Sequence, residues 1–339
     1  MPELPLVSVI TPCYNGEAFL DRYFQSVLSQ SYPNIELIFV NDGSTDRSEE
    51  IALSYRERLE ARGIRYLYIA QENKGISEAV NAGLRRFSGD YLTWPDSDDW
   101  MTPDCIAKKV DYLEAHPEKD IVQCQTNVVN EDAPDRVVGI MRRLDTGRGD
   151  VFDDLIFGRD IYYAPVGWMV RSSAFLSANP SRQIRDAYHV GQNWQMLLPV
   201  AYTCACGFIP EPLAYYLVRK GSHSRRETDY ASKVNKAARQ EATLKNILSE
   251  IDMPEEKRQA YFERLEIRGA KSRLRLAMQY HRPDDLKREY ALLRGKNACS
   301  RADTLRCLRG RFPLLDAVCS PVLHQWTRFR RWMRHRLPS

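Results

Sequence analysis

Acidic side chains gather in one short stretch of this chain of 339 residues. Asp96, Asp98 and Asp99 follow the apolar run 91–94 almost directly. Three neighbouring carboxylates repel one another, and a bound cation is the usual way to hold such a group together. Carboxylate oxygens select hard ions such as Mg²⁺ or Mn²⁺, which commonly complete their coordination shell with phosphate oxygens. The stretch therefore predicts a metal site that serves a phosphate-bearing ligand.

Two earlier loops carry groups that would suit the same ligand. Residues 11–16 follow the first apolar run of the chain, and residues 41–46 follow the second. The second loop offers the carboxylate of Asp42 beside glycine and serine, where a helix is expected to begin. A plainer interpretation stays open, because Asp42 and Gly43 also suit an ordinary turn.

Other phosphate-binding motifs are missing from the sequence. There is no GxxxxGK[ST] loop, which argues against a P-loop NTPase, and no GxGxxG after the first strand, which argues against a dinucleotide cofactor. A nucleotidyltransferase would need a glycine-rich N-terminal loop with arginine, which is missing too. For the acidic stretch, one alternative stays open: Asp98 or Asp99 would also suit the cap of a helix after Pro103.

The elements that must position these loops alternate between strand and helix patterns. Strands are expected at 6–11, 35–40, 65–69, 91–94 and 121–125, and helices at 19–28, 46–58, 76–87 and after Pro103. This alternation predicts an α/β fold with a mainly parallel sheet and helices on both faces. Right-handed crossovers then bring the carboxyl ends of the strands to one edge, where such sheets bind ligands.

The later part of the chain changes in character. Residues 131–158 are polar and contain glycine, which predicts loops, whereas strand-like runs return at 164–171 and 204–218. After Ser224 the apolar residues recur at helical spacing. We therefore expect an α/β domain over residues 1–225 and a helical extension over residues 226–339.

Charge is distributed unevenly along the chain. The net charge is +4, but residues 301–339 contain nine arginines and two aspartates, which leaves −3 for residues 1–300. Such a body does not suggest nucleic-acid binding. The end of the chain mixes its arginines with Trp326, Phe329, Trp332 and Met333, which predicts contact with a peripheral anionic membrane surface. The alternative is a helix packed on the body with a solvated basic face.

Composition also bears on the compartment. The N-terminus has no basic region followed by a small-residue cleavage site, which predicts no signal peptide. The longest uncharged run, at 190–210, is too polar and broken for a transmembrane helix. Eight cysteines without a CxxC pair suggest reduced thiols. We expect a cytoplasmic protein, placed by its basic end on the inner face of the cell membrane.

Several spaced motifs together resemble the family 2 glycosyltransferases with the GT-A fold. They are VSVITPCYNGEAFLDRYFQSVLSQSYPNIELIFVNDGSTD, ENKGISEAVNAGLRRFSGDYLTWPDSDD and IPEPLAYYLVRKGSHS, within residues 5–225. The resemblance implies a Rossmann-like GT-A sheet and inverting transfer of a sugar from a nucleoside-diphosphate sugar, in particular a UDP-sugar. It further implies dependence on Mg²⁺ or Mn²⁺ and a glycan or lipid-linked acceptor in surface polysaccharide synthesis.

Matching positions take their roles from this resemblance. Asp42 would bond the base of the nucleotide, and Asp96 would lie near the ribose and the metal. Asp98 would bind the metal ion, with Asp99 supporting the site. His223 would be a further contact to the metal or the diphosphate, unless it is a solvent-exposed loop histidine. The remaining donor-site positions are Thr11, Pro12, Tyr14, Asn15, Lys74, Gly75 and Ser97.

One position departs from the family pattern. The family's Glu-Asp pair supplies a general base, but Gln192 and Asn193 stand at the matching place. Amides accept no proton near neutral pH, so either another carboxylate serves, the site works differently, or transfer has been lost. Asp186 is the expected base, with His189 as second candidate; Asp186 would otherwise cap the following helix. The two amides would hydrogen-bond acceptor hydroxyls.

Two functions follow from these observations. The intact acidic stretch favours an enzyme that transfers a sugar. The amide pair favours a non-catalytic, sugar-nucleotide-binding scaffold subunit of the same kind of pathway. Hydrolysis of a sugar nucleotide, with or without acceptor, distinguishes the two.

Overall fold

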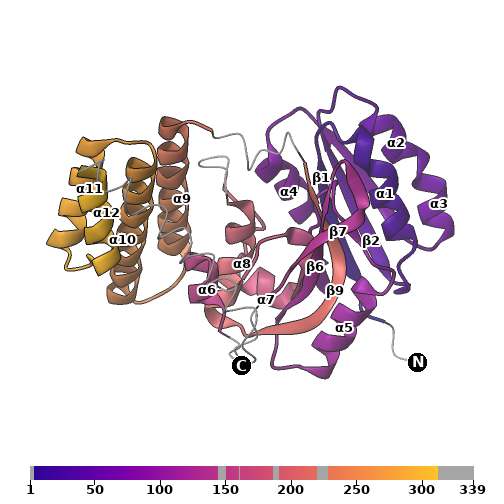
Figure 1. Cartoon of the computed structure of the whole chain (residues 1–339). Coiled ribbons are helices and arrows are strands. Elements are labelled where there is room, and N and C mark those ends of the chain that lie inside the picture. Colours follow the sequence, from indigo (N-terminus) through magenta and orange to yellow (C-terminus); the bar gives the residue numbers. More distant parts are fainter. Residues whose placement is uncertain (1–3, 144–149, 160, 186–190, 220–227, 312–339) are drawn as a thin grey trace. The chain divides into compact units, whose positions relative to one another are not determined.

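The computed structural model describes residues 4–143, 150–159, 161–185, 191–219 and 228–311. The chain divides into two compact units, Met1–Arg225 with Asn246–Asp252 and Arg226–Lys245 with Met253–Ser339. The first unit contains the sheet of the molecule, and the second is helical (Figure 1).

The alternation of elements predicted a mainly parallel sheet, and one part of the nine-stranded sheet, made of four neighbouring strands, is parallel throughout. Its strands, in spatial order, are β3 (Arg65–Gln71), β2 (Ile35–Asp42), β1 (Val7–Cys13) and β4 (Tyr91–Thr93). Because these strands run in one direction, their carboxyl ends meet at one edge of the sheet. The loops at residues 11–16, 41–46 and 95–99 all leave from that edge.

Helices cover both faces of this part (Figure 1). On one side lie α1 (Glu17–Leu28), α2 (Ser48–Ser54) and α3 (Arg56–Ala61), and on the other lies α4 (Ile76–Leu84). Leu20, Phe24 and Val27 of α1 recur at helical spacing and are buried. A Cβ on Gly83 would lie 2.4 Å from Cγ2 of Ile10, so glycine lets α4 approach β1 closely.

The rest of the sheet mixes strand directions. Beyond β4 it continues with β8 (Trp168–Arg171), β6 (Ile121–Asn130), β9 (Cys206–Val218) and β5 (Trp100–Met101). β8 runs antiparallel to both β4 and β6, β9 runs parallel to β6, and β5 runs antiparallel to β9. Around these strands lie α5 (Cys105–Ala115), the short 3₁₀ helix Pro165–Gly167, α7 (Ser172–Ala178) and α8 (Gln192–Thr203).

The prediction of loops throughout residues 131–158 was wrong. Strand β7 (Ala133–Met141) forms a hairpin with β6, and α6 (Phe152–Phe157) follows. Backbone pairing with β6 forms β7, while its residues 135–139 are exposed to solvent. No apolar face is therefore needed, and a pattern of hydrophobic residues cannot reveal such a strand.

The helical unit has its own core. Its helices are α10 (Glu255–Gln279), α11 (Pro283–Gly295), α12 (Arg301–Arg311) and the part of α9 (Tyr230–Glu250) that ends at Lys245. Leu274, Leu286 and Leu293 are fully buried between α10 and α11, beside an ion pair of 3.0 Å between Arg273 and Glu289. None of the helices in the described ranges combines the length and apolar character needed to cross a bilayer.

Candidate active site

The loops after β1 and β2 are joined by hydrogen bonds. Asn15 has a left-handed backbone with φ of 52°, which asparagine tolerates better than most residues. Its N–H donates to Oγ of Ser44 at 3.0 Å, and its Oδ1 accepts from the N–H of Thr45 at 2.8 Å. The N–H of Gly16 donates to Oγ of Ser48 at 2.8 Å. The two loops thus form one surface.

Asp42 fixes the loop that follows β3. Its Oδ1 accepts from Nε2 of Gln71 at 2.7 Å and from the N–H of Lys74 at 3.0 Å, and its Oδ2 accepts from the N–H of Gly75 at 2.9 Å. The side chain is buried. Gly43 has φ of +69°, and a Cβ there would lie 2.6 Å from a backbone nitrogen of the same loop, so only glycine fits.

The acidic stretch forms a cluster at the end of β4. Carboxylate oxygens of Asp96, Asp98 and Asp99 all lie within 4.8 Å of one another. Asp99 is 1% exposed, and its Oδ1 accepts from the N–H of Leu217 on β9 at 3.0 Å. Its Oδ2 is buried and has no hydrogen-bond partner among the described residues. Neither Asp98 nor Asp99 caps α5, whose N-cap residue is Asp104.

One guanidinium faces this cluster. Nε of Arg219 lies 2.7 Å from Oδ2 of Asp98, and its guanidinium carbon lies 5.0 Å from the ring centre of Phe19. Burial, together with the charge of Asp98, raises the pKa of Asp96 to about 7. Burial and the two neighbouring carboxylates raise the pKa of Asp99 well above its usual value.

The cluster has the properties of a hard-cation site. Its donors are all carboxylate oxygens. Among the residues that the structure describes, one of these oxygens is buried without a hydrogen-bond partner, and one guanidinium, that of Arg219, faces the three carboxylates. Desolvated like charges are costly, and a divalent cation offsets that cost. The residues present therefore fit Mg²⁺ or Mn²⁺.

The first loop also meets the acidic cluster. A Cβ on Gly16 would lie 2.8 Å from Sγ of Cys13 and 3.6 Å from Oγ of Ser97. Gly16 therefore fits between the end of β1 and the acidic stretch. All three loops that the sequence singled out meet at one place.

The donor-site positions in the first loop differ in their exposure. Tyr14 is 48% exposed, whereas the side chain of Asn15, also exposed, is bonded to the N–H of Thr45. Pro12 is buried, and the buried hydroxyl of Thr11 bonds with that of Tyr23 under α1. Thr11 and Pro12 can therefore offer only their backbone to a ligand.

The amide pair lies at the start of α8. Gln192 is its first residue and is half-buried. Oδ1 of Asn193 accepts from Nε1 of Trp94 at 3.1 Å, and Nδ2 donates to the carbonyl of Tyr163 at 2.9 Å. The predicted residues Asp186, His189 and His223 lie outside the described residues.

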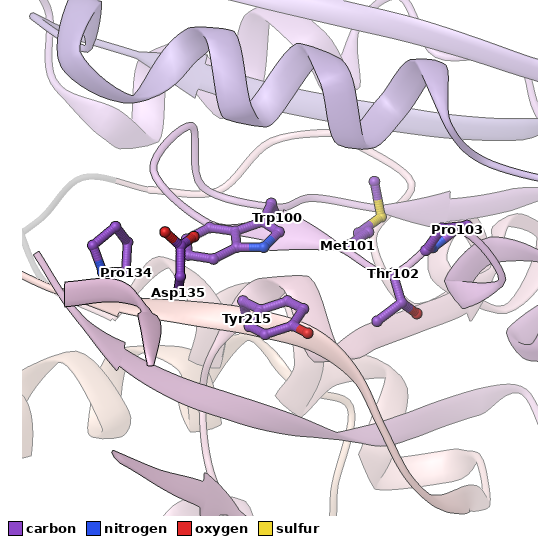
Figure 2. A pocket seen from close by; sticks show the side chains of 7 residues that line it. All are labelled: Trp100, Met101, Thr102, Pro103, Pro134, Asp135 and Tyr215. Atoms are coloured by element: carbon purple, nitrogen blue, oxygen red, sulfur yellow. The ribbon is translucent and has the colours of Figure 1, made fainter. Parts of the chain in front are cut away.

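A pocket of about 340 Å³ begins one residue beyond the cluster. Figure 2 shows Trp100 lying over Tyr215 in this pocket, and the two rings stack with centres 5.0 Å apart. The guanidinium of Arg22 lies 4.6 Å from the ring centre of Trp100. Since Trp100 and Tyr215 are also paired between β5 and β9, this contact helps to hold Asp99 beside β9. The lining residues are Trp100, Met101, Thr102, Pro103, Pro134, Asp135 and Tyr215.

Sequence reasoning missed three contributors to the site. Arg219 lies in the segment IPEPLAYYLVRKGSHS, four residues before His223. Its positive charge could have indicated a contact with the acidic stretch. Gln71 lies at the end of a predicted strand, where a side chain at the ligand edge is expected. Trp94 precedes the acidic stretch by one proline, but nothing in the sequence relates it to Asn193.

Comparison with known proteins gives a consistent result. Residues 8–176 match the family model described as glycosyl transferase family 2. The glycosyltransferase GlyA of Streptococcus pneumoniae is 47% identical over 100 residues, which are 30% of this chain and 14% of that protein. A protein of Rickettsia typhi named as an uncharacterized glycosyltransferase is 38% identical over 128 residues, which are 38% of each chain. The match thus spans well under half of either relative.

Solved structures share the fold. TarS of S. aureus, in complex with UDP-GlcNAc, superposes with a TM-score of 0.61 at 15% identity over 90% of this chain and 89% of that chain. The mannosyltransferase PcManGT of Pyrobaculum calidifontis, in complex with GDP-Man and Mn²⁺, gives 0.57 at 16% identity over 94% and 87%. The GT-A fold expected from the sequence is confirmed.

Replacing Asp42 by asparagine should loosen the loop after β3. The new amide nitrogen would face N–H donors, and one buried acceptor would be lost, which costs about 1–3 kcal/mol of unfolding free energy. We expect faster hydrogen exchange at the amides of Lys74 and Gly75, together with a lower midpoint in urea. The control is Asp135→Asn, since that side chain is 97% exposed. Unchanged protection of both amides would contradict the role of Asp42.

Proposed function

We propose that the chain, whose residues 8–176 match the glycosyl transferase family 2 model, is a metal-dependent glycosyltransferase. It moves a sugar from a nucleoside-diphosphate sugar to a glycan or lipid-linked acceptor in surface polysaccharide synthesis. The observation that carries the proposal is the cluster of Asp96, Asp98 and Asp99 at the ligand edge of the sheet, where one buried oxygen of Asp99 has no hydrogen-bond partner in the described part of the chain.

The donor we propose is a UDP-sugar. Support comes from TarS, which shares the fold and was solved with UDP-GlcNAc, while PcManGT was solved with GDP-Man. Asp42 and the exposed ring of Tyr14 lie on the loops that would receive the base. The backbone N–H groups of Lys74 and Gly75 donate to Asp42, which places this loop beside the proposed site of the base.

The acidic cluster would hold the cofactor. Asp98 and Asp96 are the proposed ligands of Mg²⁺ or Mn²⁺, with Asp99 behind them and His223 as a further proposed contact. When bound, the ion would supply a Lewis acid that helps to neutralise the charge of the departing diphosphate. Arg219 already contributes one positive charge beside Asp98.

The transfer we propose inverts the anomeric centre. The acceptor oxygen bonds to the anomeric carbon on the face opposite the diphosphate, and the bond from that carbon to the phosphate oxygen breaks. The diphosphate keeps the electron pair, and the hydroxyl proton passes to a carboxylate. Asp186 is the proposed base, with His189 as second candidate, because Gln192 and Asn193 are amides.

The proposed division of labour follows the chain. Residues 1–225 would bind the donor and carry out transfer. Residues 226–339 would form a helical extension whose basic end contacts an anionic membrane from the cytoplasmic side. A scaffold subunit that binds a sugar nucleotide without transfer is the alternative, and the amide nature of Asn193 is the observation that favours it.

Asp98→Ala should abolish Mn²⁺-dependent affinity for UDP, because the cluster would lose the carboxylate nearest Arg219. Asp98→Glu should weaken this affinity, since the longer side chain misplaces the ion. Titration calorimetry with UDP in the presence of Mn²⁺ or of EDTA measures both effects. Asp111→Ala, on the exposed side of α5, is the matched control. Unchanged Mn²⁺-dependent affinity in Asp98→Ala would show that this site is wrong.

Asp186→Asn tests the proposed base. We expect kcat to fall by ~10²-fold or more, the range for loss of a general base, while donor affinity stays near wild type. Steady-state transfer from the UDP-sugar measures kcat, and titration calorimetry measures the donor affinity. A variant with wild-type kcat would exclude Asp186. A wild-type chain that binds UDP with Mn²⁺ but neither transfers nor hydrolyses the sugar would favour the scaffold.

Removal of residues 312–339 should reduce binding to anionic vesicles. Each basic group near an anionic surface contributes ~1 kcal/mol, and the segment contains five arginines between 328 and 336. Co-sedimentation with phosphatidylglycerol vesicles measures the loss, and phosphatidylcholine vesicles serve as the control. Equal binding by the full-length and the shortened chain would remove the membrane proposal.

A further inference from the structure

Asn193 lies between two groups of opposite hydrogen-bonding character. The indole N–H of Trp94 can only donate, and it lies 3.1 Å from Oδ1 of Asn193. The carbonyl of Tyr163 can only accept, and it lies 2.9 Å from Nδ2. The two partners therefore fix which end of the amide is oxygen and which is nitrogen.

Only a side chain that both accepts and donates satisfies this position. A carboxylate would accept from the indole, but its second oxygen would face the carbonyl oxygen of Tyr163, and two acceptors repel. A leucine of similar size would leave the N–H of Trp94 without a partner, and Trp94 is only 2% exposed. Both changes remove one hydrogen bond from a partly buried polar group.

Trp94 lies where its position affects the acidic cluster. It follows Thr93, whose hydroxyl donates to the carbonyl of Trp168 at 2.7 Å, and it precedes the acidic stretch by one proline. A shift of the indole would be passed through this short, rigid connection to Asp96. Asn193 and Trp94 are 99 residues apart in the sequence, so their bond also ties the start of α8 to the end of β4.

We infer that Asn193 is a positioning residue: its amide links Trp94 to the carbonyl of Tyr163 and so holds the acidic stretch in place. The amide at this position is therefore a requirement of the local hydrogen bonding and not a lost general base. The inference rests on the proposed function only where nucleotide binding is the readout.

The test combines two variants, each of which breaks one arm of the link. Asn193→Asp loses donation to Tyr163, and Trp94→Phe loses donation to Asn193. We expect each to speed amide hydrogen exchange at residues 97–99 by tenfold or more while the amides of β1 keep their protection. Each should raise the dissociation constant of UDP with Mn²⁺ by tenfold or more. The dissociation constant of the double variant should be no higher than that of the more impaired single variant, because both changes break the same link.

Trp168→Phe is the matched control. It removes the same atoms from another buried tryptophan, whose indole N–H has no partner among the described residues. It should leave exchange at residues 97–99 and UDP affinity within twofold of wild type. If Trp168→Phe changes both as much as Trp94→Phe does, the effects reflect a general loss of packing, and the inference is overturned. Unchanged exchange in Asn193→Asp, or a gain of turnover, would also overturn it. If the wild type shows no Mn²⁺-dependent UDP binding while the exchange effects persist, the proposed function fails and the positioning role stands.

Discussion

The charge balance of the acidic cluster is the constraint on which the arrangement of much of the first unit depends. Three carboxylates lie within 4.8 Å of one another, and in the described ranges the guanidinium of Arg219 faces them. The pKa of Asp96 and that of Asp99 are raised in the folded chain, and burial is the main cause. The folded chain therefore holds these protons more tightly than the unfolded chain. Its stability falls as pH rises from ~4, the unfolded value, towards about 7. A divalent cation would offset this loss.

The surroundings of the cluster are fixed mainly by backbone groups. Asp99 is held by the N–H of Leu217, and Asp42 holds the N–H groups of Lys74 and Gly75. Asn15 joins the first two loops through its own backbone and side chain. Such contacts need no ligand, so the ligand edge is organised before a nucleotide arrives. Preorganisation of this kind reduces the ordering cost of binding.

Local patterns were sufficient for part of this structure. The parallel part of the sheet follows from alternating strand and helix periods, and the acidic cluster from three aspartates after a buried strand. Strand β7 could not be predicted, because pairing with β6 forms it and its middle residues are exposed. The pairing of Arg219 with Asp98 and of Asn193 with Trp94 joins distant segments, which a single sequence does not relate. Local periodicity thus yields elements and candidate ligands, whereas the contacts that orient them depend on the assembled fold.

The irregular register of β9, the long curved strand of Figure 1, also bears on how this chain can change in evolution. Cys124 pairs with Ile209, but the next residue, Gln125, pairs with Pro212, so two residues of β9 are passed over. Deleting both would keep the alternation of inward and outward side chains. It would also bring Arg219 to the place of Leu217 and carry the guanidinium ~7 Å along the strand, at ~3.4 Å per residue. A second irregularity follows at once, because Thr126 pairs with Ala214 and Leu213 is passed over as well. The length of this irregular segment therefore sets the distance between Arg219 and Asp98, whereas an exposed turn elsewhere can change in length without moving either residue.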